Sequence, residues 1–337
     1  MSFPDPSRLV LAIVQVRGLA RSFQSKGSTV AALNGVDLDV NEGEVFGLLG
    51  PNGAGKTTFI RILSTLLLPT SGYATIAGYD VAKEPDKIRP IINMASGAER
   101  AGYEFISARG NLWFFSQLYG ISTEDFKQRV ASLSAQLELE GYIDKKVFEL
   151  STGYRQRMTI ARAFINDPRV VFMDEPTIAL DVMTARRIRE FLAHEAKESK
   201  RTIFLATHNM AETEAICNRV AIIDKGKILV CESPENLKRN YGRPAYVMEL
   251  NPAPSSLDIF TSIPYVKGVT STLDEERGVA TVKVVVEDDA ALDQITKTLE
   301  ASGIRLLSSW RQEPTLEEVF VTLVGRGFTE REHENAS

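Results

Sequence analysis

The stretch Gly50-Pro51-Asn52-Gly53-Ala54-Gly55-Lys56-Thr57-Thr58 decides the fold expected for this chain, because it reads G-x-x-x-x-G-K-T. The apolar run 45–49 before it predicts a buried strand, and apolar residues at helical spacing over 59–67 predict a helix after it. Glycines let backbone N–H groups surround an anion, and a helix N-terminus adds a partial positive charge. We therefore expect a phosphate-binding loop in which Lys56 contacts the β- and γ-phosphates of a nucleotide and the Thr57 hydroxyl binds Mg²⁺.

Size and composition are those of a globular protein with more than one domain. The chain has 337 residues, 44% hydrophobic and 25% charged, and its net charge of −5 does not favour nucleic-acid binding through a basic surface. Cys217 and Cys231 lack metal-ligand spacing and predict reduced thiols, as in a cytosolic protein. The sequence contains neither an apolar run of membrane-spanning length nor the pattern of a signal peptide, so work at a membrane would need a partner.

Strands that alternate with helices predict an α/β core with a parallel sheet and right-handed crossovers. Short strands with Gly and Asn turns are expected over 12–40, before the glycine loop. Between about 97 and 165 the pattern is mostly helical, which predicts a helical subdomain inserted into the core. The later strands of the first domain are expected at 72–77, 91–95, 170–173, 202–206, 220–223 and 227–230.

A second domain is expected after a change of composition near residue 241, where Pro and Gly become frequent. Its strands and helices follow in the order βαββαβ over 246–310, which is the ferredoxin-like plan. A short helix is expected at 316–323, and the charged residues 326–337 predict a disordered tail. We place the first domain at 9–240 and the second at 241–325.

A pair of carboxylates follows the apolar run 170–173. Asp174 and Glu175 would stand at the carboxyl end of a strand, where open α/β sheets place their ligands. Asp174 is expected in the Mg²⁺ shell, commonly through water, and Glu175 could polarise an attacking water near the γ-phosphate. Alone the pair could be a solvated strand end, but together with the glycine loop it predicts a hydrolytic site.

A third motif, Leu150-Ser151-Thr152-Gly153-Tyr154-Arg155-Gln156-Arg157, precedes a helix, and Ser151 by itself would only be an N-cap. Its place between the glycine loop and the carboxylate pair makes it resemble the signature L-S-G-G-x-[QR]-[QR] of ATP-binding cassette (ABC) proteins. The resemblance covers about residues 12–240, with the motifs in the family's order. It implies a P-loop NTPase with a parallel-sheet core, an antiparallel β subdomain and an inserted helical subdomain, followed by an α+β ferredoxin-like domain.

The resemblance implies roles for further residues. Phe23 falls where the family has the aromatic that stacks on adenine, although a core aromatic is the other reading. Asp181 falls in the D-loop, and His208 matches the switch histidine that contacts the γ-phosphate. Lys56, Glu175 and His208 are thus expected in catalysis, and Thr57 and Asp174 at Mg²⁺. ATP is expected to contact Phe23, Gly50, Pro51, Asn52, Gly53, Ala54, Gly55, Lys56, Thr57, Thr58, Ser151, Thr152, Gly153 and Asp181.

Three positions depart from the family pattern. Thr152 replaces a glycine of the signature, and its backbone could still cap a phosphate if its φ is negative. Ile178 stands before the D-loop, where the family usually has a small residue. The Q-loop glutamine is absent; spacing puts its position near Ala98, and the neighbouring Glu99 could supply a carboxylate to the metal shell.

The resemblance also implies partners. Two copies would face each other head to tail, so that ATP on one glycine loop is covered by Ser151 and Gly153 of the other copy. ATP hydrolysis would drive transport by a separate membrane-spanning permease. This places the chain as a peripheral protein on the cytoplasmic side of the membrane. The second domain, with EPTLEEVFVTL (313–323) near its end, resembles the accessory domain of drug-export cassettes of the daunorubicin-resistance type, so export of a drug, lipid, polysaccharide or ion is expected. Packing or dimerisation is the simplest role for that domain.

Two alternatives stay open. A soluble ABC-type ATPase acting on ribosomes or nucleic acid would usually carry two cassettes, a coiled-coil insertion or basic arms, and the sequence shows none of these. A regulatory protein that binds ATP without hydrolysing it is disfavoured by Glu175 and His208.

Overall fold

The computed structural model describes residues 12–25, 28–97, 102–274 and 277–325. The chain divides into two compact units, one up to Pro234 and one from Glu235 onward. The tail expected at 326–337 lies outside the described residues.

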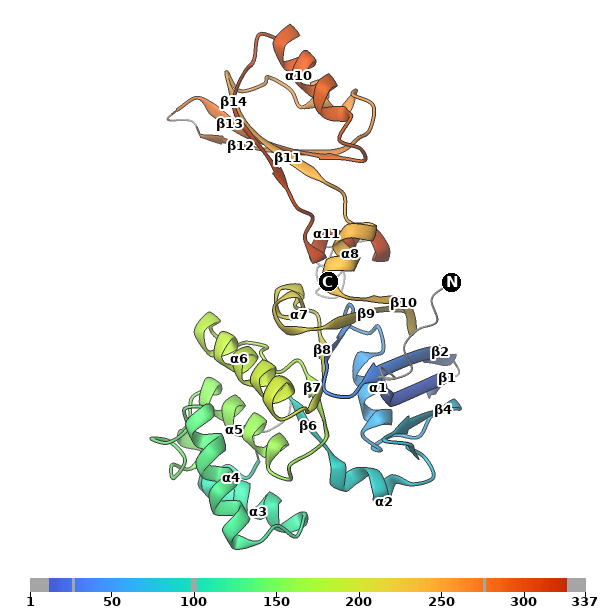
Figure 1. Cartoon of the computed structure of the whole chain (residues 1–337), viewed down its shortest axis with the longest axis vertical. Helices are drawn as coiled ribbons and strands as arrows, with labels where there is room; N and C mark the ends of the chain where they lie inside the picture. Colours follow the sequence, from blue (N-terminus) through green and yellow to red (C-terminus); the bar gives the residue numbers. More distant parts are fainter. Residues whose placement is uncertain (1–11, 26–27, 98–101, 275–276, 326–337) are drawn as a thin grey trace, which may run out of the picture. The chain divides into compact units, whose positions relative to one another are not determined.

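A six-stranded sheet forms the centre of the first unit (Figure 1). Its strand order is β10-β9-β3-β8-β7-β6; β10 is antiparallel to β9 and the other pairs are parallel. Every residue of β3, β7 and β8 is buried, because these strands are covered on both faces. The predicted parallel core is confirmed. Its strands are β3 (Val45–Leu49), β6 (Ile92–Ser96), β7 (Val170–Asp174), β8 (Thr202–Thr207), β9 (Arg219–Asp224) and β10 (Lys227–Glu232).

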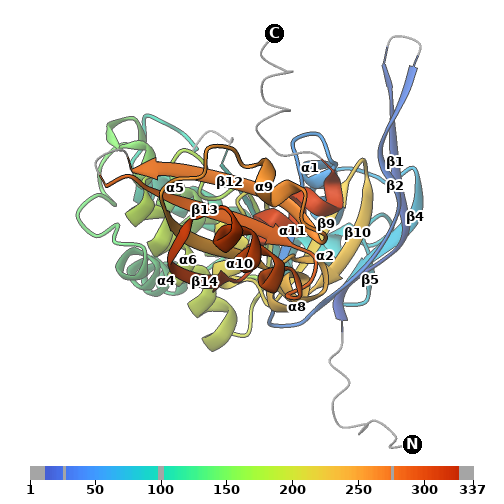
Figure 2. The same cartoon turned by 90° about the horizontal axis from the view of Figure 1, so that it is seen from above.

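Helix α1 (Lys56–Leu63) packs in one apolar core with the parallel sheet and a second, antiparallel sheet of order β2-β1-β4-β5. Figure 2 shows β1 and β2 as one long hairpin that extends past β4. Because Phe59 and Ile62 of α1 are fully buried, the helix is held firmly, and so is the glycine loop before it. The antiparallel strands are β1 (Ala12–Ser25), β2 (Ser28–Asn41), β4 (Ser71–Ile76) and β5 (Tyr79–Asp80).

Helix α1 is shorter than its apolar pattern predicts. The spacing extends to Leu67, whereas the helix ends at Leu63. Thr65 then adopts a φ of 62°, and the N–H groups of Leu66 and Leu67 both point to the carbonyl oxygen of Arg61, at 2.9 and 3.0 Å. The Leu66 side chain is 66% exposed, so it does not extend the buried face of the helix.

Helices cover the parallel sheet and build the expected helical subdomain. Between β6 and β7 the chain forms α3, α4, η3 and α5, drawn in green in Figure 1. The Ser107 and Ser122 hydroxyls accept hydrogen bonds from backbone N–H groups at the starts of α3 and α4, which caps both helices. The helices of this unit are α2 (Pro85–Ile88), η2 (Arg89–Ile91), α3 (Ala108–Leu118), α4 (Thr123–Gln136), η3 (Val147–Glu149), α5 (Thr152–Phe164), α6 (Val182–Glu198) and α7 (Met210–Ile216).

The second unit has the expected ferredoxin-like plan. Its four strands are antiparallel in the order β12-β13-β11-β14, and its core lies between this sheet and the helices α9 and α10. Helix α8, which the sequence reading did not include, precedes them, and Gly242 at its end lies so close to Lys238 and Pro314 that a Cβ there would clash with both. The elements are α8 (Pro234–Tyr241), β11 (Ala245–Asn251), α9 (Asp258–Thr261), β12 (Val266–Asp274), β13 (Val279–Val286), α10 (Ala291–Ala301), β14 (Arg305–Gln312) and α11 (Leu316–Val324).

The ring of Phe204 on β8 joins three elements of the first unit. Its centroid lies 5.3, 5.8 and 5.7 Å from those of Phe46 on β3, Phe59 on α1 and Phe172 on β7. We predict that Phe204→Ala lowers the free energy of unfolding by about 3–5 kcal/mol, because it leaves a cavity in this aromatic cluster. Denaturant unfolding followed by circular dichroism measures the loss. Phe105→Ala, at a ring that is 79% exposed, is the control, and an equal loss in both variants would contradict the prediction.

Candidate active site

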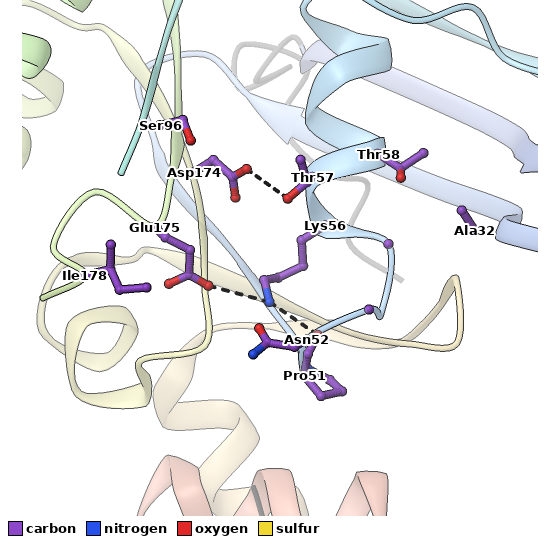
Figure 3. Close-up of a pocket in the computed structure, with 12 residues that line it drawn as sticks. Ala32, Pro51, Asn52, Lys56, Thr57, Thr58, Ser96, Asp174, Glu175 and Ile178 are labelled. Carbon is purple, nitrogen blue, oxygen red and sulfur yellow. Dashed lines mark hydrogen bonds and ion pairs between the residues drawn. The ribbon is translucent and has the colours of Figure 1, made fainter. Parts of the chain in front are cut away.

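A cleft of about 280 Å³ opens where β3, β6 and β7 end, at the carboxyl edge of the parallel sheet (Figure 3). Open α/β sheets bind their ligands at this edge. The glycine loop and the carboxylate pair, which are more than a hundred residues apart in sequence, both face the cleft. Its lining consists of Ala32, Pro51, Asn52, Gly53, Gly55, Lys56, Thr57, Thr58, Ser96, Asp174, Glu175 and Ile178.

Two glycines of the loop are required by its geometry. Gly55, the N-cap of α1, has a φ of 109°, a conformation that residues with a Cβ rarely adopt. Gly50 packs so tightly against the carbonyl oxygen of Ile223 on β9 that a Cβ there would clash with it. The loop can therefore turn sharply from β3 into α1 and place the N-terminus of α1 at the cleft.

The ammonium group of Lys56 is buried in the loop. Its Nζ donates to the carbonyl oxygens of Gly50 and Pro51, at 2.7 and 3.3 Å, and lies 3.6 Å from Glu175 Oε1. Burial lowers the pKa of Lys56, and the nearby carboxylates of Glu175 and Asp174 oppose that shift. A buried cation with these partners can exchange them for phosphate oxygens, which carry more negative charge.

Thr57 and Asp174 present two oxygens side by side. The Thr57 hydroxyl donates to Asp174 Oδ2 at 2.9 Å, and Asp174 is buried at the end of β7. Burial raises the pKa of Asp174, and the hydrogen bond from Thr57 opposes that shift. A hydroxyl and a carboxylate are ligands that Mg²⁺ takes readily, with phosphate and water completing its shell, so the donor set fits this ion.

Glu175 is held from several sides. Its backbone has a φ of 53°, and its N–H donates to the carbonyl oxygen of Ala206 at 2.8 Å. Its Oε1 lies 2.8 Å from His208 Nδ1, within hydrogen-bond distance. The Thr207 hydroxyl donates to Oε2 at 3.3 Å. His208 therefore reaches the site through Glu175.

Eight expected site residues do not line the cleft: Gly50 and Ala54 of the glycine loop, His208, and five residues that lie away from the loop and the carboxylate pair. Phe23, on β1, is 38% exposed. The guanidinium carbon of Arg21 lies over the Phe23 ring, 4.7 Å from the ring centroid. Ser151 is the N-cap of α5, and Asp181 is the N-cap of α6, where its carboxylate accepts from the N–H of Thr184 at 2.9 Å. The five residues away from the loop and the carboxylate pair are Phe23, Ser151, Thr152, Gly153 and Asp181.

Sequence reasoning missed two residues of the cleft and gave a third no role in it. Ser96 ends β6 in register with Asp174, so the parallel strand order was the signal that could have found it. Ala32 belongs to β2, and nothing in its local sequence indicates a nucleotide site. Ile178 was noted only as a departure from the family pattern. The Q-loop position near Ala98, with Glu99, lies outside the described residues.

Comparisons with known proteins show which families the two units are similar to. The ABC transporter family model matches residues 33–178, and that of the DrrA1-3-like ATP-binding protein C-terminal domain matches 233–324. The chain is 32% identical to the daunorubicin resistance ATP-binding protein DrrA2 of Streptomyces coeruleorubidus, over 91% of this chain and 94% of that protein. It is 34% identical to the Nod factor export ATP-binding protein I of Rhizobium sp. strain N33, over 93% and 97%.

A solved structure has the fold of the first unit. The ATP-binding cassette MJ0796, dimeric and bound to ADP and Pi in a post-hydrolysis state, matches with a TM-score of 0.60 and 26% identity. The match covers 65% of this chain and 98% of that one.

The fold and the cleft thus define an ATP-hydrolysing P-loop cassette whose family binds ATP. The chain belongs to the ABC transporter family and is a nucleotide-binding subunit of an exporter, an ATPase whose reaction is coupled to transport. The alternative of action on ribosomes or nucleic acid finds no support in these matches. Among the residues that the structure describes, no helix is long and apolar enough to cross a membrane.

The buried charge of Asp174 predicts a dependence of stability on pH. Because its pKa is raised, the folded chain holds the Asp174 proton more tightly than the unfolded chain does. The resulting stabilisation is present below the unfolded pKa of about 3.9 and is lost as the pH rises through the folded pKa. Asp174→Asn should therefore melt at a higher temperature than the wild type at pH 7, without Mg²⁺ or nucleotide, and show no such gain near pH 3.5.

Thermal melts at the two pH values test this. Asp86→Asn is the control, because the Asp86 side chain is 92% exposed and its charge is solvated in both states. A gain for Asp174→Asn that is equally large at both pH values would contradict the assignment to its buried charge.

Proposed function

We propose that this chain hydrolyses ATP in the cleft as one half of a head-to-tail homodimer and drives a separate permease from the cytoplasmic side of a membrane. The proposed cargo is a drug, lipid, polysaccharide or ion, and the names of the drug-resistance and Nod factor export relatives support export. The observation that carries the proposal is the convergence of Lys56, Thr57, Asp174 and Glu175 on one cleft.

The side chains in the cleft have separate tasks. Lys56 and the N-terminus of α1 supply positive charge to the phosphates. Thr57 and Asp174 hold Mg²⁺, which when bound neutralises charge that develops on the phosphate oxygens. Glu175 orients and polarises the attacking water, and the bond from His208 keeps its carboxylate at the cleft.

A second copy would complete the site. Residues 151–153 and Asp181 stand at the N-termini of α5 and α6, outside their own chain's cleft. The Ser151 side chain makes no capping hydrogen bond in α5, so its hydroxyl can serve a phosphate held by the other copy. Thr152 is the first residue of α5 and is not among the positive-φ residues, which meets the condition for its backbone to cap a phosphate. The dimeric state of MJ0796 supports this arrangement.

The first unit of this chain has a groove in which we propose that the permease docks. A groove of about 630 Å³ runs between the end of α1, the β6 strand and α3. Its apolar rim includes Leu66, Leu118 and Tyr119, which are 66%, 67% and 40% exposed, and its charged pair Asp86 and Arg89 is joined by an ion pair. A short amphipathic helix with an apolar face fits such a groove, and we assign it to a cytoplasmic helix of the permease.

The role of Glu175 gives a direct test of hydrolysis. Glu175→Gln should lower the ATPase rate by about 10²–10⁴-fold, because an amide cannot take a proton from water. ATP binding should persist, and the ATP-bound variant should elute as a dimer in size-exclusion chromatography. Lys56→Met is the comparison, since it should lose ATP binding as well. Hydrolysis at the wild-type rate by Glu175→Gln would remove Glu175 from its proposed role.

The groove gives a test of the partner. Leu118→Glu should lower co-purification with a co-expressed permease at least tenfold, because it places a charge in an apolar interface, while ATP binding stays unchanged. Leu229→Glu is the matched control. Leu229 is 45% exposed and lies on β10, the edge strand of the six-stranded sheet opposite β6, which lines the groove. Equal recovery of permease with both variants would reject the groove as the docking site.

A further inference from the structure

A buried acid that the proposed reaction does not use lies behind the site. Glu212, in the first turn of α7, is fully buried, and its N–H donates to the Asn209 side chain at 3.1 Å. Its Oε1 accepts from the Thr177 hydroxyl at 3.0 Å. Its Oε2 is buried and has no hydrogen-bond partner within the described part of the chain. A carboxyl placed so unfavourably in the interior needs a reason beyond packing.

Thr177 lies in the turn 175–180, whose own backbone conformation and hydrogen bonds stabilise it only weakly. It begins at Glu175, with a φ of 53°, and includes Ala179, with a φ of 58°, both unusual for residues other than glycine. The backbone bonds that close it, from Ile178 N–H to Glu175 O and from Leu180 N–H to Thr177 O, are both 3.3 Å long. Strained backbone of this kind persists only where the surroundings determine it.

Two neighbours hold the turn from outside. Gly97, after β6, lies so close to the carbonyl oxygen of Glu175 and to Ile178 that a Cβ there would clash with both. The Thr177 hydroxyl is bound by Glu212, and both of these side chains are buried. The turn is thus fixed between the end of β6 and the start of α7.

The segment that carries Glu212 also holds the Glu175 side chain. Thr207 and His208, just before α7, both contact the Glu175 carboxylate. The Thr207 hydroxyl in turn accepts from the N–H of Asn209, which caps α7. One short segment, 207–212, therefore binds Glu175 at its carboxylate and at the turn that follows it.

The charges around Glu212 make its hydrogen bond to Thr177 important. Burial raises the pKa of Glu212, and the hydroxyls of Thr177 and Thr207 oppose that shift; Glu175 and Arg189 are the charged groups that act on it. The Thr177 hydroxyl donates to Glu212 at 3.0 Å, whereas the Thr207 hydroxyl donates to Glu175 at 3.3 Å, so the bond from Thr177 is the hydrogen bond to Glu212 that the proposal uses.

We propose that Glu212 is a positioning residue for hydrolysis: its hydrogen bond to Thr177 holds the turn that aims Glu175 into the cleft. The inference rests on the role proposed above for Glu175. Glu212 itself does not line the cleft and touches no reacting atom. Its loss should lower the rate of the chemical step and leave nucleotide binding intact.

The test compares kcat and KM for ATP in variants of the full chain. Glu212→Met keeps the length of the side chain and removes its acceptor, and we expect kcat to fall about tenfold with KM changed less than about twofold. Glu212→Gln keeps an amide oxygen for Thr177 and should restore kcat to within about twofold of the wild type. Glu214→Met, at an exposed position of the same helix, is the matched control and should leave kcat unchanged.

Variants of Thr177, which donates the hydrogen bond to Glu212, give an independent test. Thr177→Val should lower kcat as Glu212→Met does, and Thr177→Ser should restore it. The double variant Thr177→Val with Glu212→Met should be no slower than either single one, because both remove the same bond. If Glu212→Met fails to fold, the Thr177 pair decides the question alone.

Several results would overturn the proposal. They are a wild-type kcat in Glu212→Met, additive losses in the double variant, or a Glu212→Gln protein as slow as Glu212→Met. A fall in nucleotide affinity, measured with a fluorescent ATP analogue, that matches the fall in kcat would also reject a positioning role. A normal Glu212→Met beside an inactive Glu175→Gln removes only this inference, whereas an active Glu175→Gln removes the proposed role of Glu175 and the inference with it.

Discussion

The structure of the site depends on the parallel pairing of β3, β8 and β7. The register pairs Leu49 with Thr207 and Asp174 with Ala206, so the three strands end within one residue of the same level. The glycine loop follows β3, His208 follows β8, and Glu175 follows β7. Backbone pairing alone therefore brings the phosphate-binding cation, the carboxylate pair and the histidine to one edge, before any side chain makes a contact.

Helix α1 converts this alignment into a fixed geometry. Its apolar residues pack with both sheets, so the start of the helix cannot move without disturbing the core of the first unit. Phe204, at the centre of β8, touches rings from α1, β3 and β7 and so joins the three elements that carry the site. The loop that precedes α1 consequently presents Lys56 and Thr57 at a set distance from Asp174 and Glu175.

The site also concentrates charge where a folded protein tolerates it poorly. Lys56, Asp174 and Glu212 are buried. Burial lowers the pKa of Lys56 and raises the pKa of Asp174 and of Glu212, which in each case favours the neutral form. Glu175 adds a strained backbone at the same edge. Such groups are retained at functional sites because a preorganised charged environment stabilises the transition state more than water would. The stability of this region is thus lower than its apolar core alone would provide.

The sequence by itself determined the glycine loop, the buried strands and the two carboxylates at a strand end, because each is a local pattern of a few consecutive residues. It also indicated the βαββαβ order of the second unit. Only the tertiary structure decided that His208 reaches the cleft through Glu175, that Ser96 and Ala32 line it, and that Glu212 supports the turn behind it. The physical reason is that these contacts join residues far apart in the chain, whose distances are set by strand register and helix packing and leave no local pattern in the sequence.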